Sequence, residues 1–340
     1  MVSTGGQPVD DNSRGHLTTL EGWNQFTTAV VEPPELPAEH QWQTLTASER
    51  ELYTDQRLDY HSRLGVVATS TLRRVINTGR RLTLLNRHTI SARRGMVVSG
   101  TAGTGKTTAI TQLGKTYQAI DRARHPGHDR IPVIYATVPP SATPRMVAME
   151  FARFLGLPIP PRANITDVIE AVCGVATDTR VSLVLIDEIH NMQLGTRSGA
   201  EVSDTLKYFS ERIQATFIYS GIDVEHQGLF SGTRGRQIAG RFTLIPTVAF
   251  PLTDEWRQVV LTLEQALRLH HHPPGTLPKL ASYLHQRTGG MIGSLSHLIR
   301  GGAIEAILTG TERLTKPLLE GIDLDHAAQH NPSRKLTPTK

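Results

Sequence analysis

One short loop of this chain has the residue types and the spacing that bind phosphate groups. Residues 100–107 fit the pattern G-x-x-x-x-G-K-[ST] at every fixed position. Glycine tolerates positive φ, so successive backbone N–H groups can turn toward one anion. In such a loop Lys106 reaches the outer phosphates of a nucleotide, and Thr107 places its hydroxyl on Mg²⁺. The residues expected to line the site are Gly100, Thr101, Ala102, Gly103, Thr104, Gly105, Lys106, Thr107 and Thr108.

The alternative is a glycine-rich turn with no ligand, and the flanking sequence argues against it. Residues 96–99 predict a short buried strand, and the residues from Thr108 onward predict the start of a helix. Strand, glycine loop and helix in this order are the context that the phosphate-binding motif requires.

Two adjacent carboxylates follow a second buried strand. Residues 181–186 form a continuous apolar run, typical of a parallel strand covered on both faces, which ends in Asp187 and Glu188. Ligands of α/β sheets bind at the carboxyl ends of such strands. We expect Asp187 to hold Mg²⁺, directly or through water, and Glu188 to polarise the water that attacks the γ-phosphate. The alternative is that both carboxylates cap the next helix. Together with the loop, they predict binding of ATP or GTP.

The composition favours a globular chain with one core domain and flanking pieces over its 340 residues. No apolar run approaches the roughly 18 residues that span a membrane. The first fifteen residues contain neither a basic nor an apolar segment, and the chain has a single cysteine, Cys173, so we expect a cytoplasmic location. We interpret Cys173 as core packing, and residues 270–272, all histidine, as a basic helix end rather than a metal site.

Charge is unevenly distributed along the chain, whose net charge is +5. Residues 1–60 hold ten acidic side chains against three arginines, whereas residues 61–94 hold eight arginines and no acidic residue. An arginine-only tract is typical of a surface that binds the phosphate backbone of a nucleic acid. The alternative is a solvated helix face that pairs with the acidic segment before it. The arginines are Arg63, Arg73, Arg74, Arg80, Arg81, Arg87, Arg93 and Arg94.

The order of the remaining patterns predicts an α/β fold with a mostly parallel five-stranded sheet. Strands are expected at 96–99, 132–137, 181–186, 215–220 and 243–248. Helices are expected at 48–63, 69–78, 106–124, 144–156, 165–178, 200–212, 222–229, 254–271, 277–288, 291–308 and 314–321. We expect four parts: a partly disordered acidic extension (1–60), a nucleotide-binding core with a leading basic helical segment (61–250), a helical lid (251–322) and a flexible tail (323–340).

Taken together, these features resemble the AAA+ superfamily of P-loop ATPases, and within it the transposon-encoded ATPases of the TniB/TnsC type, relatives of the IstB and MuB regulators. The resemblance covers roughly residues 60–310. It rests on the stretches "RRGMVVSGTAGTGKTTAITQLGKTY", "VSLVLIDEIHNM", "FIYSGID", "GRQIAGRFTLIPTVAF" and "RTGGMIGSLSHLIRGGAIEAI".

The resemblance implies further site residues. Ser220 falls at the sensor-1 position, which contacts the γ-phosphate or orients the water; the alternative is a small residue closing a strand. Arg241 matches the arginine finger that reaches the nucleotide of a neighbouring subunit, with Arg236 and Arg234 as the next candidates. Where many relatives place a sensor-2 arginine, residues 289–294 read GGMIGS. Slow ATP turnover is therefore expected.

The function implied by the resemblance is ATP-dependent regulation of DNA transposition. A homo-oligomer, a ring or a helical filament, would assemble on duplex DNA without sequence preference and recruit a transposase, with a target-selection protein as a further partner. We expect DNA contacts from Thr143, Arg145 and Arg197, for each of which a plain solvent-exposed role is the alternative. Two other functions stay open: a nucleotide-controlled signalling or defence switch without DNA, and, less favoured, a small-molecule kinase.

Overall fold

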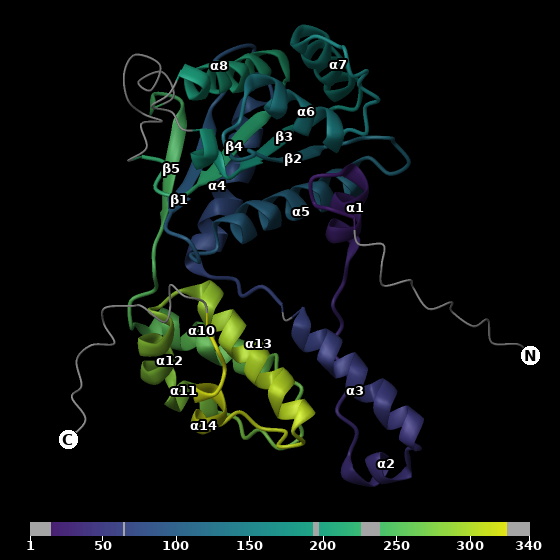
Figure 1. Ribbon diagram of the computed structural model, residues 1–340, viewed down its shortest axis with the longest axis vertical. Coiled ribbons are helices and arrows are strands. Elements are labelled where there is room, and N and C mark those ends of the chain that lie inside the picture. The colour runs from purple at the N-terminus through teal and green to yellow at the C-terminus, as the bar shows by residue number, and fades with distance from the viewer. Residues whose placement is uncertain (1–14, 64, 193–196, 226–238, 325–340) are drawn as a thin grey trace, which may run out of the picture. The chain divides into compact units, whose positions relative to one another are not determined.

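The computed structural model describes residues 15–63, 65–192, 197–225 and 239–324 (Figure 1). Contacts divide the chain into two compact units. The first is formed by the described residues within Met1–Ala29, Val75–Ser99 and Ala109–Ile245, and the second by those within Val30–Arg74, Gly100–Thr108 and Pro246–Lys340. None of the helices in these described ranges is long and apolar enough to cross a lipid bilayer.

A five-stranded sheet with the strand order β2-β3-β4-β1-β5 forms the centre of the first unit in the described part of the chain. The β2–β3, β3–β4 and β1–β4 pairs are parallel. The α/β fold with a mostly parallel sheet is therefore confirmed, and each strand lies within two residues of its expected position. The strands are β1 (Gly95–Gly100), β2 (Val133–Thr137), β3 (Leu183–Asp187), β4 (Thr216–Gly221) and β5 (Phe242–Thr247).

Helices pack on both faces of this sheet (Figure 1). On one face α6 (Pro144–Phe154) joins α7 (Ile165–Asp178) and α8 (Arg197–Arg212), and the Phe151 and Phe209 rings stack with centroids 4.5 Å apart. α5 (Lys106–Arg124) covers the other face. α4 (Ser70–Asn86) is longer than the expected helix at 69–78. Residues 222–225 are not helical, and the rest of the helix expected at 222–229 lies outside the described residues.

A helix that the sequence did not predict lies near the amino terminus. α1 (Leu20–Thr28) begins after Thr19, whose side chain accepts a hydrogen bond from the Gly22 N–H. Such a cap satisfies one of the backbone donors left open at a helix start. Trp23 lies in the middle of α1 and is fully buried in the first unit. Part of the extension is therefore a packed element of the sheet unit.

The second unit is helical in the parts that the structure describes. Its core is apolar and contains Tyr60 together with Trp256 and many leucines. Its helices are α2 (Glu39–Thr44), α3 (Ala47–Ser62), α10 (Asp254–Gln265), α11 (Thr276–Lys279), α12 (Ala281–Thr288), α13 (Ile292–Leu308) and α14 (Lys316–Glu320). The helix α3 from the extension therefore shares one core with the C-terminal helices.

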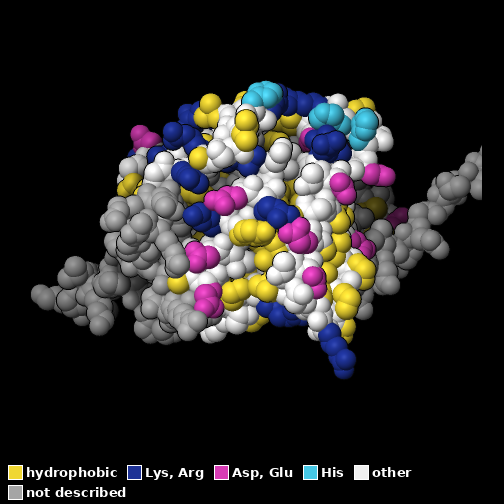
Figure 2. Space-filling view, turned by 90° about the horizontal axis from the view of Figure 1, so that it is seen from above, with side chains coloured by type: hydrophobic (Ala, Val, Ile, Leu, Met, Phe, Trp, Pro, Cys, Tyr) yellow, Lys and Arg dark blue, Asp and Glu magenta, His cyan; other side chains and the backbone are white. Residues whose placement is uncertain are grey.

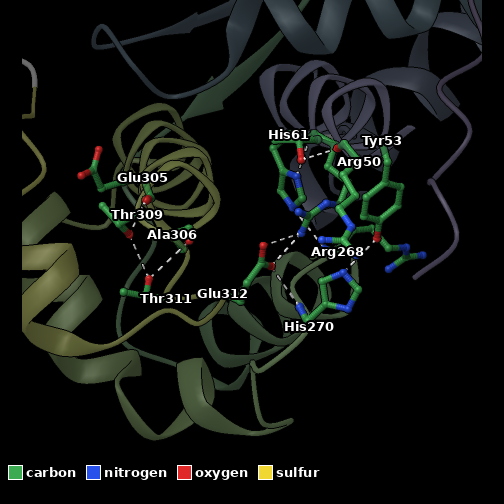
Figure 3. Close-up of polar contacts among 12 residues, drawn as sticks. Arg50, Tyr53, His61, Arg268, His270, Glu305, Ala306, Thr309, Thr311 and Glu312 are labelled. Atoms are coloured by element: carbon green, nitrogen blue, oxygen red, sulfur yellow. Dashed lines mark hydrogen bonds and ion pairs between the residues drawn. The ribbon is translucent and has the colours of Figure 1, made fainter. Parts of the chain in front are cut away.

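Polar contacts anchor α3 to the C-terminal segments (Figure 3). The Arg57 guanidinium donates to both carboxylate oxygens of Glu312, at 2.9 and 2.7 Å, and both side chains are almost buried. His61 lies at 2.8 Å from the Arg57 carbonyl through Nδ1, while its Nε2 accepts a hydrogen bond from the Arg268 N–H. This pairing fixes the neutral tautomer with the proton on Nδ1.

Candidate nucleotide-binding site

The phosphate loop belongs, by its contacts, to the second unit. Gly103 and Gly105 have φ values of 78° and 86°, the left-handed region in which glycine is strongly favoured. The Lys106 side chain is 7% exposed, and its ammonium donates to the Thr101 carbonyl at 2.7 Å. The Thr104 hydroxyl lies 2.7 Å from that of Thr247. The loop is thus held in a defined shape with its lysine folded over it.

The start of α13 contacts this loop within the second unit. The Gly293 N–H donates to the Gly103 carbonyl at 3.0 Å. A Cβ on Gly105 would fall 3.3 Å from Cγ2 of the Ile292 side chain, so this side chain packs closely against the loop. These residues belong to the stretch in which a sensor-2 arginine was not found. The backbone of Gly293 and the side chain of Ile292 are therefore among the groups of this stretch that contact the loop.

Asp187 and Ser220 lie at the same edge of the sheet in the first unit. The parallel registers pair Thr137 with Asp187, and Val98 with Ser220. This is the carboxyl edge of the strands, where ligands of α/β sheets bind. β1 ends at this edge, and the phosphate loop follows β1 in the chain. Ser220 is fully buried, and its hydroxyl has no hydrogen-bond partner among the described residues. Such an orphaned hydroxyl fits a side chain that meets a ligand.

Hydrogen bonds from Tyr135 and Glu188 hold both carboxylate oxygens of Asp187. Its Oδ2 accepts from the Tyr135 hydroxyl at 3.2 Å, and its Oδ1 accepts from the Glu188 N–H at 2.9 Å. Burial, and next the Asp187 charge, raise the pKa of Tyr135, so the phenol stays protonated and acts as donor. A carboxylate at the end of a buried strand is a hard oxygen donor, which is what Mg²⁺ prefers. The residue present therefore fits the expected metal.

Glu188 has a φ of 56°, which is uncommon for a residue with a side chain. Such strain concentrates at functional sites. Its carboxylate lies 3.2 Å from His190 Nε2, and His190 Nδ1 accepts a hydrogen bond from the Ile222 N–H at 3.3 Å. Because Nδ1 is the acceptor, the neutral ring carries its proton on Nε2 and donates to Glu188. This contact orients the expected catalytic carboxylate. Neither His190 nor Tyr135 was among the site residues expected from the sequence.

Arg241 lies at the amino end of the edge strand β5. Its carbonyl accepts a hydrogen bond from the Gly95 N–H at the start of β1. Asp187 and Ser220 stand at the other end of the strands, so Arg241 is on the opposite edge of its own sheet. With Phe242 and Tyr219, whose rings stack at 4.9 Å, it borders a cavity of about 110 Å³. The other two candidate arginines, Arg234 and Arg236, lie outside the described residues.

The residues expected to contact DNA have structural contacts in the first unit. The Thr143 hydroxyl caps α6 by accepting from the Met146 N–H. The Arg145 guanidinium donates to the carbonyls of Ala163 and Pro161. The backbone of Arg197 begins α8, and its side chain lies outside what the structure describes. DNA binding by these three residues stays a prediction.

The arginine-only tract forms part of a polar groove in the first unit. Arg87, the residue after α4, and Arg124 of α5 are exposed and line a groove of about 460 Å³, to which Tyr117 also contributes. Arg130 lies there too, fixed by two hydrogen bonds to the buried Asp121. Among the described residues Arg63 of the tract pairs with Asp59, but no carboxylate forms an ion pair with Arg87. Pairing with the acidic segment therefore does not account for this groove.

Comparisons with known proteins agree with the fold. A family model of bacterial TniB proteins matches residues 64–251. The ORC1 protein of Aeropyrum pernix in complex with DNA has a TM-score of 0.57 and 17% identity, covering 77% of this chain and 66% of that one. The ORC2 protein of Aeropyrum pernix in its ADPNP–ADP complexes gives 0.56 and 17%, covering 73% and 65%.

A third similar structure is that of Drosophila ORC bound to DNA, with a TM-score of 0.53 and 14% identity, covering 88% of this chain and 72% of that one. This chain thus spans just under two thirds of the length of the two Aeropyrum proteins. At these identities the likeness shows the fold alone. No curated protein sequence is significantly similar to this chain.

Proposed function

We propose that this chain regulates DNA transposition by assembling with ATP on duplex DNA. The reason is that the chain belongs to the bacterial TniB family of AAA+ ATPases. In this proposal the oligomer marks a target, recruits a transposase and disassembles on hydrolysis. Family membership is the observation that carries the proposal, since it joins an ATPase fold to transposition.

The nucleotide part of the proposal rests on two groups of residues. The loop of residues 100–108 would cradle the phosphates of ATP, with Lys106 on the β- and γ-phosphates. Thr107 and Asp187 would hold Mg²⁺, which draws charge from the phosphates when bound. The proton on His190 Nε2 keeps the Glu188 carboxylate in one orientation, and Glu188 would accept a proton from the attacking water. The buried Ser220 hydroxyl would complete this arrangement.

The position of Arg241 supports assembly through the nucleotide. Arg241 lies at the amino end of β5, whereas the expected metal ligand lies at the carboxyl end of β3. A six-residue strand is roughly 20 Å long at about 3.3 Å per residue. Arg241 is therefore poorly placed for the nucleotide of its own subunit, which favours a role at a neighbour's site.

The polar groove between α4 and α5 supports contact with a phosphate backbone. Arg87 follows the end of α4 and Arg124 ends α5, and both present guanidinium groups without carboxylate partners among the described residues. By contrast, the face seen in Figure 2 mixes acidic, basic and hydrophobic side chains. Elsewhere on the first unit, arginines have carboxylate partners: Arg212 of α8 forms an ion pair with Glu170 of α7. The groove is therefore a better candidate for a polyanion than that mixed face.

Binding to duplex DNA with and without a non-hydrolysable ATP analogue tests the proposal. We expect binding that requires the analogue, is similar for unrelated duplexes and weakens steeply with salt, because it depends on counterion release. Exchanging both Arg87 and Arg124 for alanine should reduce the salt slope by about two, roughly one for each lost phosphate contact. Arg153→Ala is the matched control, since Arg153 already pairs with Glu150. Nucleotide-dependent assembly without any DNA binding would favour the signalling switch instead.

A further inference from the structure

Helix α1 is locked onto α5 by contacts centred on Trp23. The indole Nε1–H donates to the Gln118 side-chain oxygen at 2.6 Å, and Gln118 Nε2 donates to Asn24 at 2.9 Å. The Lys115 ammonium donates to the Ala29 carbonyl at the end of α1. A Cβ on Gly114 would fall 2.7 Å from the Trp23 ring, so glycine at this helical position permits the close approach.

The Trp23 ring also reaches the sheet. It stacks on Tyr135 of β2 with centroids 5.7 Å apart and planes 12° from parallel. Tyr135 in turn donates its hydroxyl to Asp187 Oδ2. All three residues are at least 95% buried: Trp23 is 0% exposed, Tyr135 5% and Asp187 2%. A continuous contact therefore runs from the amino-terminal helix to the carboxylate expected to hold Mg²⁺.

We propose that Tyr135 is a positioning residue for the metal-binding carboxylate of Asp187, and that α1, through Trp23, holds Tyr135 in place. The inference rests on the proposed nucleotide site. The family model matches residues 64–251, so Trp23 lies outside the matched segment. In this proposal, a helix from outside that segment helps to position the metal-binding carboxylate.

The physical basis is the rotational freedom of a carboxylate. Without the Tyr135 hydroxyl, Asp187 would keep the bond from the Glu188 N–H at Oδ1 but lose the bond from the phenol to Oδ2. Groups that hydrogen-bond a ligating carboxylate fix its orientation, and their loss costs about tenfold or more in metal affinity. The Trp23 stack limits the Tyr135 ring to one orientation, since rings in a packed interior hold their rotamers.

A purely structural role for these residues would lower stability but leave the Mg²⁺ requirement unchanged. The measurement is therefore the Mg²⁺ concentration at half-saturation for ATP binding, obtained by calorimetry, with ATP affinity in a chelator as the metal-free reference. Tyr135→Phe removes one oxygen atom and keeps the ring. Tyr60→Phe is the matched control, because its hydroxyl also makes one hydrogen bond, to the Ala266 carbonyl in the second unit.

We expect Tyr135→Phe to raise the Mg²⁺ half-saturation concentration about tenfold, with metal-free ATP affinity unchanged. Trp23→Ala should raise the Mg²⁺ half-saturation concentration by a smaller factor, and Tyr60→Phe should leave that concentration unchanged. Equal Mg²⁺ half-saturation in Tyr135→Phe and Tyr60→Phe would overturn the inference while leaving the nucleotide site intact. If the wild-type chain binds no ATP with Mg²⁺, the proposed function itself is wrong, and the inference with it.

Discussion

At the level of single residues, we expect nucleotide binding to depend most directly on the Lys106 ammonium. It is the charged group of the phosphate loop, and it is nearly buried beside the Thr101 carbonyl. We expect Lys106→Ala to abolish ATP binding, because the positive charge facing the β- and γ-phosphates is lost. Calorimetric titration with ATP and Mg²⁺ measures this, and an unchanged affinity would refute the role of Lys106.

Glu188 is expected to act in hydrolysis and not in binding. Glu188→Gln removes the proton acceptor for the attacking water but preserves the shape of the side chain. The variant should bind ATP normally and lose most of its steady-state ATPase. His190→Ala, which removes the hydrogen-bond donor facing Glu188, should lower turnover with little change in ATP affinity. Undiminished hydrolysis in Glu188→Gln would show that another group activates the water.

The sequence predicted residues whose motifs are local, and it missed Tyr135, which contacts Asp187 from a distant part of the chain. Asp187 and Glu188 stand next to each other at a strand end, so the strand pattern revealed them. Tyr135 is separated from Asp187 by 52 positions, and only the parallel register of β2 and β3 brings them together. A polar aromatic residue within a buried strand was the available signal, because a buried phenol needs a hydrogen-bond partner.

At the level of elements, long periodic segments were predicted well and the extension was not. α5 and α7 occupy the expected ranges because apolar spacing and caps define them. α1 is only nine residues long, and isolated helices of that length are marginal in water. Burial of Trp23 against α5 stabilises it, and tertiary packing of this kind leaves no periodic trace in the sequence.

The attachment of α3 to the C-terminal helices depends on a buried ion pair. Glu312→Gln would leave the Arg57 charge without its partner, and such a loss costs about 3 kcal/mol. Arg63→Ala is the matched control on the same helix, because its pair with Asp59 is exposed and contributes about 0–1 kcal/mol. Urea unfolding of the full chain compares the two. Equal destabilisation would mean that the Arg57–Glu312 pair adds nothing beyond a surface contact.

The same attachment should weaken in mild acid. Burial lowers the pKa of His61 below its usual value of 6.5. The unfolded chain therefore takes up a proton as the pH falls through about 6.5, while the folded chain does not until the pH reaches the lower folded pKa. Stability from His61 is present above 6.5 and is lost across this window. His61→Gln, which cannot titrate, should show a smaller drop in melting temperature between about pH 7.5 and about pH 6. An equal drop would exclude His61 as the cause.

At the level of the whole molecule, Arg241 is expected to serve the nucleotide of a neighbouring subunit. Arg241→Ala should leave folding and ATP affinity near normal but reduce both ATP hydrolysis and assembly. Loss of an arginine finger of this kind lowers the rate of hydrolysis by on the order of a thousandfold. Mixing it with Lys106→Ala protein forms interfaces that combine an intact Arg241 with an intact Lys106. Hydrolysis should partly return. A mixture that assembles but stays inactive would exclude action of Arg241 across subunits.

In the proposed function, ATP drives this chain to assemble on duplex DNA. Electron microscopy of the protein with duplex DNA, with and without a non-hydrolysable ATP analogue, tests it most directly. We expect rings or helical filaments that enclose DNA only when the analogue is present, and none with Lys106→Ala protein. Assemblies that form equally without nucleotide, or that form with nucleotide but exclude DNA, would contradict it.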